Sequence, residues 1–307
     1  MKVLQANIQI GSYAFQSITD VKITKSVDLL TDTATIKMPT HFRVRDNDQE
    51  VITEDAIKPG DYVKIEIGYK KSGLKQEFVG FVNKVKPTTP LEIHCEDSTW
   101  LLKRKNISKN WNDGVNLDEL LTYLLEGTNI ELADNLPELS LGKYRIKNAN
   151  ALQVLEKLQE NTGLSIYMTD ENKLYVGFQQ SNNIGEIAAY DLEKDLTKND
   201  LSFRKADDRK IKIKYVYINS ANEKTSYEFG DADGDLRTYH TSAVSDPVKL
   251  EEMAKAQLSK LKYDGYDGSM TSFLTPYCTR GMAVKLNDDS KAHRNGSYFV
   301  NEVVVNF

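Results

Sequence analysis

The first hundred residues alternate between apolar and polar positions, as half-buried β-strands do. In DYVKIEIGY (61–69), a valine and two isoleucines fall on one face, while a lysine and a glutamate fall on the other. The polar stretch 43–55 is expected to be a surface loop. Similar short strand patterns occupy VKITK (21–25), ATIKMP (34–39), QEFVGFVNKVK (76–86) and LEIHC (91–95).

The middle of the chain changes to helical spacing. Residues 116–127 place five leucines on one side and end at a glycine, and 98–105 is long enough for a helical turn. Residues 148–163 form a second amphipathic stretch, with an asparagine to cap it and a glycine to end it. The segments 164–168 and 174–176 then predict a hairpin.

The last third returns to strand patterns. RKIKIKYVYINS (209–220) alternates strictly, and TSYEF (225–229) is a suitable neighbouring strand. Its lysine face of Lys210, Lys212 and Lys214 has two interpretations. A solvated outer face is favoured because lysine is seldom buried, and the alternative is a role in lining a channel or pairing with acidic groups of a neighbour.

A single helix interrupts these strands. Asp246 can cap it and Pro247 suits its first turn. Strands resume after it, with a turn at Asn295-Gly296, and continue to the end of the sequence. The apolar stripe of the helix comprises Leu250, Met253, Ala254, Leu258 and Leu261.

A short pattern occurs twice. FVNKV (81–85) follows GDYVKIEI (60–67), and FVNEV (299–303) follows GMAVKLND (281–288). The distance from the first glycine to the phenylalanine is 21 residues in one copy and 18 in the other. Both copies have the form strand, variable turn, strand, so the sequence indicates one small β unit present twice.

Composition limits the possible functions. The 307 residues suffice for two or three domains, and 40% apolar with 28% charged residues is ordinary for a globular protein. The net charge of −5 argues against a protein that grips nucleic-acid phosphates. No apolar run approaches the roughly 18 residues that cross a bilayer, and the start alternates like a strand rather than a signal peptide. Cys95 and Cys278 are expected to be small buried thiols in a reducing cytosol.

Candidate catalytic and metal-binding groups are scattered. His41, His94, His240 and His293 stand in separate contexts without metal-ligand spacing, and no nucleophile or phosphate-loop motif occurs. Carboxylates are plentiful, as on any soluble surface. We therefore expect no catalytic, cofactor-binding or metal-binding residues and no cofactor.

The segment DADGDLRTYHTS (231–242) resembles a calcium loop only in part. Asp231, Asp233 and Asp235 fall at the first three ligand positions, but Leu236 stands where glycine is needed and Ser242 where a glutamate is needed. We expect a polar turn between strands.

Two tryptophans flank a basic run. Trp100 and Trp111 are expected to fix the α/β module to the first β unit, with a role in gripping a partner as the alternative. Lys103, Arg104 and Lys105 between them are expected to be a helix end with its charges in water.

The order of these segments resembles the bacteriophage tail hub proteins of the late control gene D family and the hub part of type VI secretion spike proteins. The likeness spans nearly the whole chain, and the order of segments carries it rather than one motif. The stretches that carry it are 27–39, 78–105, 151–177 and 268–307.

The resemblance implies a fold and a function. The fold would be α+β and mainly β, with two similar tail-tube-like β-barrels, residues 1–103 and 184–307, and a small α/β module, residues 104–183. Three copies would form a homotrimeric, pseudo-sixfold ring that joins a hexameric tail tube to a threefold spike. The expected partners are a second and third copy, the tail tube protein, the spike or tip protein and other baseplate proteins.

The resemblance also implies where the protein is located, and it leaves alternative functions open. The protein would lie in the virion after assembly in the host cytoplasm, without a membrane segment or specific nucleic-acid binding, although DNA can pass through the ring. It would not be an enzyme, since the sequence ends at Phe307 with no room for an added lytic domain. The alternatives are a type VI-like or phage-derived hub and, less favoured, a tail-tip cell-wall hydrolase.

Overall fold

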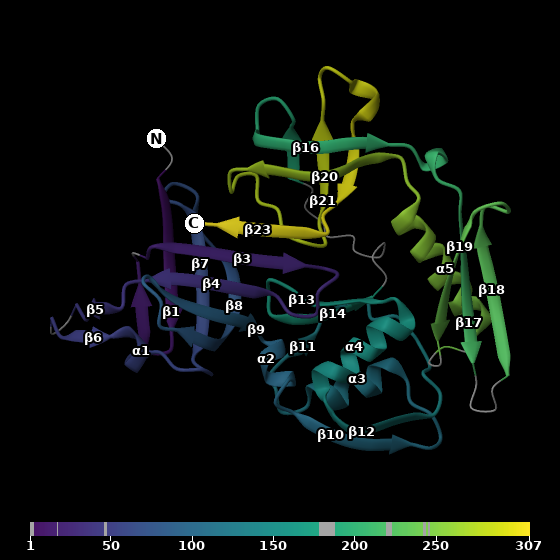
Figure 1. The fold of residues 1–307 in the computed structure, drawn as a ribbon, viewed down its shortest axis with the longest axis horizontal. Coiled ribbons are helices and arrows are strands. Elements are labelled where there is room, and N and C mark those ends of the chain that lie inside the picture. The colour runs from purple at the N-terminus through teal and green to yellow at the C-terminus, as the bar shows by residue number, and fades with distance from the viewer. Residues whose placement is uncertain are drawn as a thin grey trace.

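The described part of the chain is mainly β, with 49% of its residues in strands and 18% in helices. The computed structural model describes residues 3–16, 18–45, 48–177, 188–218, 223–241, 244 and 246–307. Figure 1 shows a large sheet on one side, a helical module below the centre, and two β-rich parts from the last third of the chain. None of the described helices is long and apolar enough to cross a membrane.

The largest sheet has eight strands, in the order β2-β1-β7-β8-β9-β4-β3-β23, and every neighbouring pair is antiparallel. Seven strands come from the first hundred residues, and the eighth is the last strand of the chain. The strands are β1 (Leu4–Ile10), β2 (Tyr13–Phe15), β3 (Asp20–Ser26), β4 (Thr33–Met38), β7 (Tyr62–Tyr69), β8 (Gly73–Lys86), β9 (Leu91–Asp97) and β23 (Glu302–Asn306).

The predicted alternation produces the core of this sheet. Val63, Ile65 and Ile67 of β7 are at most 1% exposed, while Lys64 and Glu66 face the other way and pair with each other. Nineteen buried residues of the described chain form this core, all but Val305 from the first hundred positions. Burial of apolar surface on this scale makes the first unit the best-packed β part of the molecule.

The expected barrel closure is not confirmed. Strands β2 and β23 are the two ends of the large sheet, and none of the sheets in the described part of the chain is closed. The loop expected at 43–55 is wrong where the structure describes it. An exposed ribbon of β5 (His41–Arg43) and β6 (Glu50–Ile52) leads into the helical turn α1 (Thr53–Ala56). The ribbon was not predicted because each of its strands has three residues with one half-buried side chain, which is too short a stretch to establish a period.

The α/β module follows the predicted pattern. In α4, Asn150 accepts a hydrogen bond from Gln153 N (2.8 Å), and Gly163 ends the helix at φ 68°. The predicted hairpin is β13 paired with β14. The helical turn α2 (Thr99–Leu102) leads into the module. Its elements are β10 (Asn106–Trp111), α3 (Leu117–Leu125), β11 (Glu131–Leu132), β12 (Tyr144–Asn150), α4 (Ala151–Thr162), β13 (Ser165–Met168) and β14 (Lys173–Gly177).

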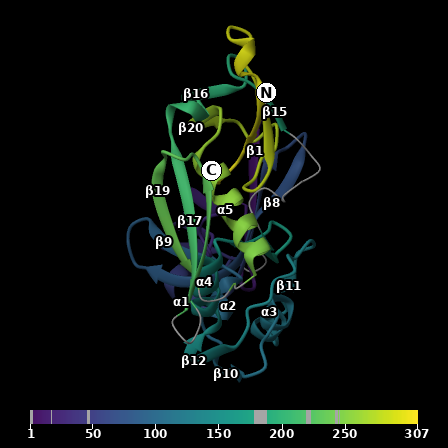
Figure 2. The same ribbon diagram turned by 90° about the vertical axis from the view of Figure 1, so that its right-hand side faces the viewer.

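One part of the last third packs with this module. Strands β17 (Ile211–Ile218), β18 (Lys224–Gly230) and β19 (Asp235–Thr241) form a sheet in the order β18-β17-β19, beside helix α5 (Pro247–Leu261). Figures 1 and 2 show α5 lying along this sheet. Asp246 caps α5 as predicted, accepting from Val248 N at 2.9 Å. The buried residues of this part belong to the same apolar cluster as the leucines of α3 and α4.

The other part of the last third has the small core. Only Tyr190, Val284 and Leu286 are buried in its cluster among the described residues. Its elements are β15 (Ala188–Asp191), β16 (Leu196–Arg204), η2 (Ala206–Asp208), β20 (Gly265–Ser272), β21 (Ala283–Asn287), η3 (Ala292–Arg294) and β22 (Gly296–Phe299). They form the sheets β15-β21-β22 and β16-β20.

The repeated pattern forms two equivalent hairpins, β7–β8 and β21–β22. Tyr62, two positions after the first glycine, pairs with Phe81. Ala283, two positions after the second glycine, pairs with Phe299. The two copies therefore have the same register despite turns of different length.

The hydrogen bonds at the base of the two hairpins also match. Gly60 N donates to Val82 O at 2.8 Å, and Gly281 N donates to Val300 O at 2.8 Å. In each copy the valine N–H donates to the carbonyl of the residue after the glycine, at 2.8 and 3.0 Å. Both glycines have positive φ, 96° and 80°. The internal repeat read from the sequence is thus a repeat of local structure.

Candidate functional site

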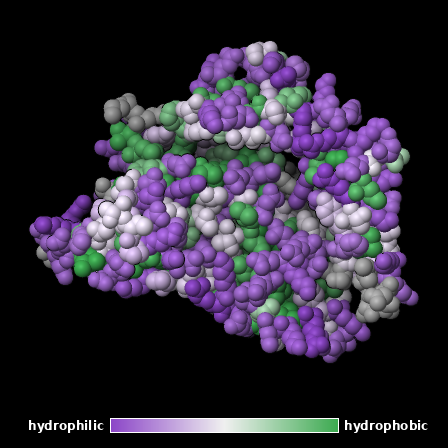
Figure 3. Space-filling model, in the orientation of Figure 1, coloured by the Kyte–Doolittle hydropathy of each residue, from purple (hydrophilic) through white to green (hydrophobic). Residues whose placement is uncertain are grey.

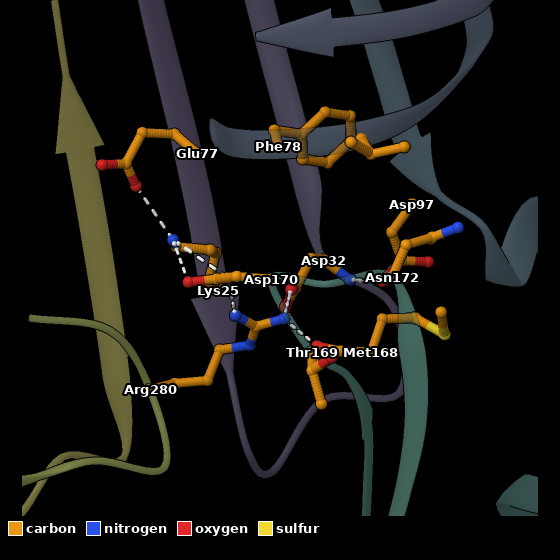
Figure 4. A pocket seen from close by; sticks show the side chains of 11 residues that line it. Lys25, Asp32, Glu77, Phe78, Asp97, Met168, Thr169, Asp170, Asn172 and Arg280 are labelled. Carbon is orange, nitrogen blue, oxygen red and sulfur yellow. Dashed lines mark hydrogen bonds and ion pairs between the residues drawn. The ribbon is translucent and has the colours of Figure 1, made fainter. Parts of the chain in front are cut away.

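A buried cluster of charged side chains lies where three parts of the chain meet (Figure 4). We call it the charged junction and define it by Lys25, Asp32, Glu77, Asp97, Asp170 and Arg280. Strands of the large sheet contribute Lys25, Glu77 and Asp97, and the loop between β3 and β4 contributes Asp32. The β13–β14 turn of the module contributes Asp170, and the segment before β21 contributes Arg280.

Arg280 joins the last third of the chain to the other two parts. The residue is 3% exposed, and its guanidinium forms an ion pair with Asp32 at 2.6 Å. It also forms an ion pair with Asp170 and donates to the carbonyl of Met168. Arginine suits this position because its planar group can donate several hydrogen bonds at once.

Lys25 is the second cation of the junction. Its Nζ lies 2.9 Å from Glu77 and 3.3 Å from Asp170, and the residue is 1% exposed. Glu77 enters the junction through a β-bulge. Ile65 pairs with Phe78 and the next residue of β7 pairs with Gln76, so Glu77 is the extra residue and its side chain is redirected.

Asp170 is the carboxylate that both cations share. Burial acts to raise its pKa, but Lys25 and Arg280 outweigh burial and hold the pKa at about 2. Tyr277 adds a hydrogen bond from its hydroxyl at 2.6 Å. Gln76 Nε2 donates to the Asp170 carbonyl at 2.7 Å, so the turn is tied to β8 as well.

The pKa values of the other three carboxyl groups are raised instead. Burial raises the pKa of Asp32 to about 7 against the attraction of Arg280, and it raises the pKa of Asp97 to about 6. Burial also raises the pKa of Glu77. With four carboxyl groups and two cations, the junction lacks the positive charge to keep every carboxylate ionised, so it retains protons in mildly acidic solution.

The space inside the junction is small. Its cavity of about 20 Å³ can hold one water molecule. Ligand pockets typically measure hundreds of Å³, so no saccharide or peptide can reach these carboxylates as a substrate. Arg280 Nε is buried without a partner among the described residues, which makes it a suitable donor to such a water.

The four histidines stand on four different elements. His41 and His240 are exposed on β5 and β19, and His293 is exposed in η3. His94 is half-buried in β9, 3.4 Å from Glu92. In the described ranges no three His, Cys, Asp or Glu residues are grouped so as to hold a metal ion.

The partial calcium loop is a turn between β18 and β19. Asp231 accepts from Lys262 Nζ at 2.6 and 2.8 Å and from Ile211 N at 2.9 Å. Asp233 pairs with Lys210, and Asp235 lies 3.6 Å from Arg237. Lysine and arginine side chains therefore pair with all three carboxylates.

The lysine face of β17 pairs within its own sheet. Lys214 and Lys212 lie 2.8 and 3.8 Å from Glu228 of β18, with both side chains partly exposed. This agrees with the solvated outer face favoured from the sequence. Lys105 was expected to extend into water at a helix end. Instead, its Nζ donates to the carbonyls of Tyr123 and Glu126 and so caps the end of α3.

The two tryptophans have different roles. Trp100 stacks on Phe81 of β8, with ring centroids 5.0 Å apart, and so fixes α2 to the large sheet as predicted. Trp111 packs inside the module against Tyr123 and Tyr144, and donates to Glu119 at 2.9 Å. The expectation that Trp111 also contacts the first unit is wrong, because its strand β10 pairs with β12 within the module.

Both cysteines are free thiols. Cys95 is 2% exposed in the core of the large sheet, as predicted. Cys278 is half-buried, between Tyr277 and Arg280 in the segment that closes the junction.

The fold is similar to that of solved phage tail proteins. A 43 kDa tail protein of prophage MuSo2 from Shewanella oneidensis covers 98% of this chain over 93% of its own length, with 12% identity and a TM-score of 0.65. A tail protein from Neisseria meningitidis covers 99% over 92% of its length, with 14% identity and a TM-score of 0.66.

A type VI secretion protein is also similar. A component of the Escherichia coli system covers 98% of this chain over 72% of its own length, with 10% identity and a TM-score of 0.62. No family model matches the sequence, and no curated protein matches it. At these identities the likeness defines the fold, which is that of phage tail proteins and of type VI secretion proteins related to them.

Proposed function

We propose that the chain is a structural hub subunit of a phage tail baseplate or tail tip. Three copies form a ring with six similar β units, which joins a hexameric tail tube to a threefold spike. The observation that carries this proposal is the repeat: two hairpins with the same register and the same closing hydrogen bonds stand in one chain. The likeness of the whole fold to tail proteins supports it.

The repeat matters because of symmetry. A sixfold tube that ends directly on a threefold spike would leave half of its contacts unmatched. Three chains with two β units each present six similar surfaces toward the tube and a threefold arrangement toward the spike, and rotation closes such a ring. Surface shape performs this function, so no catalytic residues are needed.

The proposal has specific parts. The first β unit is residues 1–103 and the α/β module is residues 104–183. The second β unit is residues 184–307, of which β17, β18, β19 and α5 pack with the module. Each β unit is proposed to correspond to a tail-tube-like barrel. The partners are two further copies, the tail tube protein, the spike or tip protein and other baseplate proteins. The place is the virion after assembly in the host cytoplasm, as for a protein of the late control gene D type.

Mass measurement by light scattering tests the ring. The expected mass is about 104 kDa, three times the 34.8 kDa of one chain. Electron microscopy of the same sample is expected to show rings with six similar densities. A monomer at high concentration that also stays monomeric when mixed with its tube and spike proteins would refute the proposal.

A hub of a type VI-like or phage-derived injection system is the second candidate. The likeness to the Escherichia coli secretion component, over nearly the whole chain, favours it. Genes for a membrane complex beside this gene would support it, whereas capsid and portal genes would support the phage role. A cell-wall hydrolase is disfavoured by the small closed junction, and zymography on peptidoglycan tests it.

A further inference from the structure

The segment 273–280, between β20 and β21, fastens the small second β unit to the rest of the molecule. Leu274 packs against the core of the large sheet. Tyr277 donates to Asp170, and the ammonium of Lys75 lies 4.0 Å from the Tyr277 ring. Arg280 ends the segment inside the charged junction. We call residues 273–280 the latch.

Closing the latch buries an uneven set of charges. Arg280 is the one charged residue that the latch itself contributes. It meets Asp32 and Asp170 directly, and Lys25 serves Asp170 and Glu77 on the other side. Asp97 contributes a fourth carboxyl, whose oxygens accept from Asp32 N at 2.7 Å and Thr99 N at 2.9 Å. An opened latch would admit water to these groups, so ionising all of them is easier in the open state.

We propose that the latch closes with the uptake of a proton by the charged junction, so that it is held shut in mildly acidic solution and opens more often as the pH rises toward neutrality. The proton resides on Asp32 or Glu77. Asp97 is a poorer acceptor because both of its oxygens receive backbone hydrogen bonds, whereas Asp32 receives one, from Ser26 N at 3.1 Å, and its other oxygen faces Arg280. This device does not depend on the proposed role in a tail.

The direction follows from the groups that face the latch. Burial raises the pKa of Asp32 to about 7, with Arg280, Asp97 and Lys25 around it, and raises that of Glu77, which faces Lys25, Asp170 and Lys75. A carboxyl with a raised pKa stabilises the closed state below its solvated pKa of about 4, and that stabilisation is lost as the pH rises through about 7.

The remaining groups do not reverse this trend. The pKa of Asp170 is held at about 2, so its stabilising effect is lost only in strong acid. Burial raises the pKa of Tyr277 and raises that of Cys278 to about 11, so both stay neutral near pH 7. Raising the pH from 5 to 8 therefore favours the open state of the latch.

The chain carries its own reporter of this opening. Cys278 lies in the latch and is half-buried, while Cys95, the other cysteine, is 2% exposed in the core. Labelling with N-ethylmaleimide, followed by mass spectrometry of peptides, separates the two thiols. Cys278 reports latch opening, and Cys95 reports unfolding of the large sheet.

The experiment measures the Cys278 labelling rate of the full chain from pH 5 to pH 8. Each rate is divided by the rate in urea-unfolded protein at the same pH, which removes the reactivity of the thiolate itself. One linked proton changes the opening equilibrium by at most about tenfold per pH unit, so the ratio can rise by at most about a hundredfold between pH 5 and pH 7. We expect a rise of at least about tenfold over this range. Cys95 should stay unlabelled throughout.

Two variants and one control complete the test. Asp32→Asn and Glu77→Gln replace the two proposed proton carriers, and at least one of them should flatten the pH dependence of the ratio. Asp233→Asn alters an exposed pair with Lys210 and should keep the wild-type slope. The proposal is overturned if the wild-type ratio is constant with pH, or if both junction variants keep the wild-type slope. If one variant does not fold, the other decides.

Discussion

The hairpins β7–β8 and β21–β22 share one register and one set of closing hydrogen bonds, yet they stand in different surroundings. The first has β1 on one side and β9 on the other, within an eight-stranded sheet. The second has only β15 beside it in the described residues. The first packs on a core of nineteen buried residues and the second on a core of three.

The chain after each hairpin explains part of this difference. In the first copy, residues 84–86 continue along β8 and pair with β9 of the same unit. In the second copy, the matching residues begin β23, which leaves its unit and pairs with β3 of the large sheet. Phe299 likewise packs with Val27, Tyr167 and Tyr175 outside its own unit. The first hairpin is therefore flanked by strands of its own unit, whereas the chain after the second hairpin joins another sheet.

Replacing Arg280 should cause the largest loss of stability, because this side chain joins the second unit to its neighbours. The matching position in the first copy is Pro59, which has no such function. Arg280→Ala leaves Asp32 without its ion-pair partner and Asp170 with Lys25 alone, and breaking a buried ion pair costs about 3 to 5 kcal/mol of unfolding free energy. Urea denaturation measures it.

The matched control is Arg294→Ala. Arg294 is half-buried and its guanidinium lies 5.0 Å from the Phe203 ring, so its loss should cost about 1 kcal/mol or less. Equal losses in the two variants would contradict the role of the junction.

Alanine substitution of equivalent apolar residues in the two hairpins should give the next largest difference in stability. Ile65 and Leu286 both stand five residues after their glycine and are 0% and 3% exposed. We expect Ile65→Ala to cost about 4 kcal/mol and Leu286→Ala about 2 kcal/mol, because the larger core cannot collapse around the cavity as easily. The same denaturation experiment compares them, and a larger loss for Leu286→Ala would reverse the ranking of the cores.

Regular elements could be predicted from the sequence because local rules determine them. The Asn150 cap, the Gly163 stop and the alternation in β7 each depend on residues a few positions apart. The repeat could be recognised because each copy lies within one short stretch of the sequence. The small ribbon at 41–52 and the open sheet were not predicted, since strands of three residues are too short to establish a period and sheet closure depends on distant pairings.

The charged junction was not predicted, although one signal for it existed. Lys25 falls in the same phase of β3 as Val21 and Ile23, so the alternation itself points this lysine inward. Glu77 reaches the junction only through a bulge, and Asp170 and Arg280 only through the packing of distant segments. No local pattern reports either of these causes.

The two glycines should show a smaller difference. Both have positive φ, where any side chain is strained, so alanine costs about 1 kcal/mol or more at each. A Cβ at Gly60 would also lie 3.3 Å from the Trp100 ring. We expect Gly60→Ala to cost about 2 kcal/mol and Gly281→Ala about 1 kcal/mol in thermal or urea unfolding. Stability unchanged in both would show that the hairpin bases tolerate a change of backbone conformation.

The smallest effect is expected at the equivalent lysines, Lys64 and Lys285. Lys64 lies 2.6 Å from Glu66, with both side chains partly exposed, whereas Lys285 is exposed. Exposed pairs contribute about 0 to 1 kcal/mol, so Lys64→Ala should cost about 0.5 kcal/mol or less and Lys285→Ala nothing measurable. Salt separates charge from packing. At about 1 M NaCl, where screening acts within about 3 Å, the difference between the variants should disappear. A difference that persists in salt would mean that the stem of Lys64 packs on the sheet, and the first hairpin would then be better packed on its outer face as well.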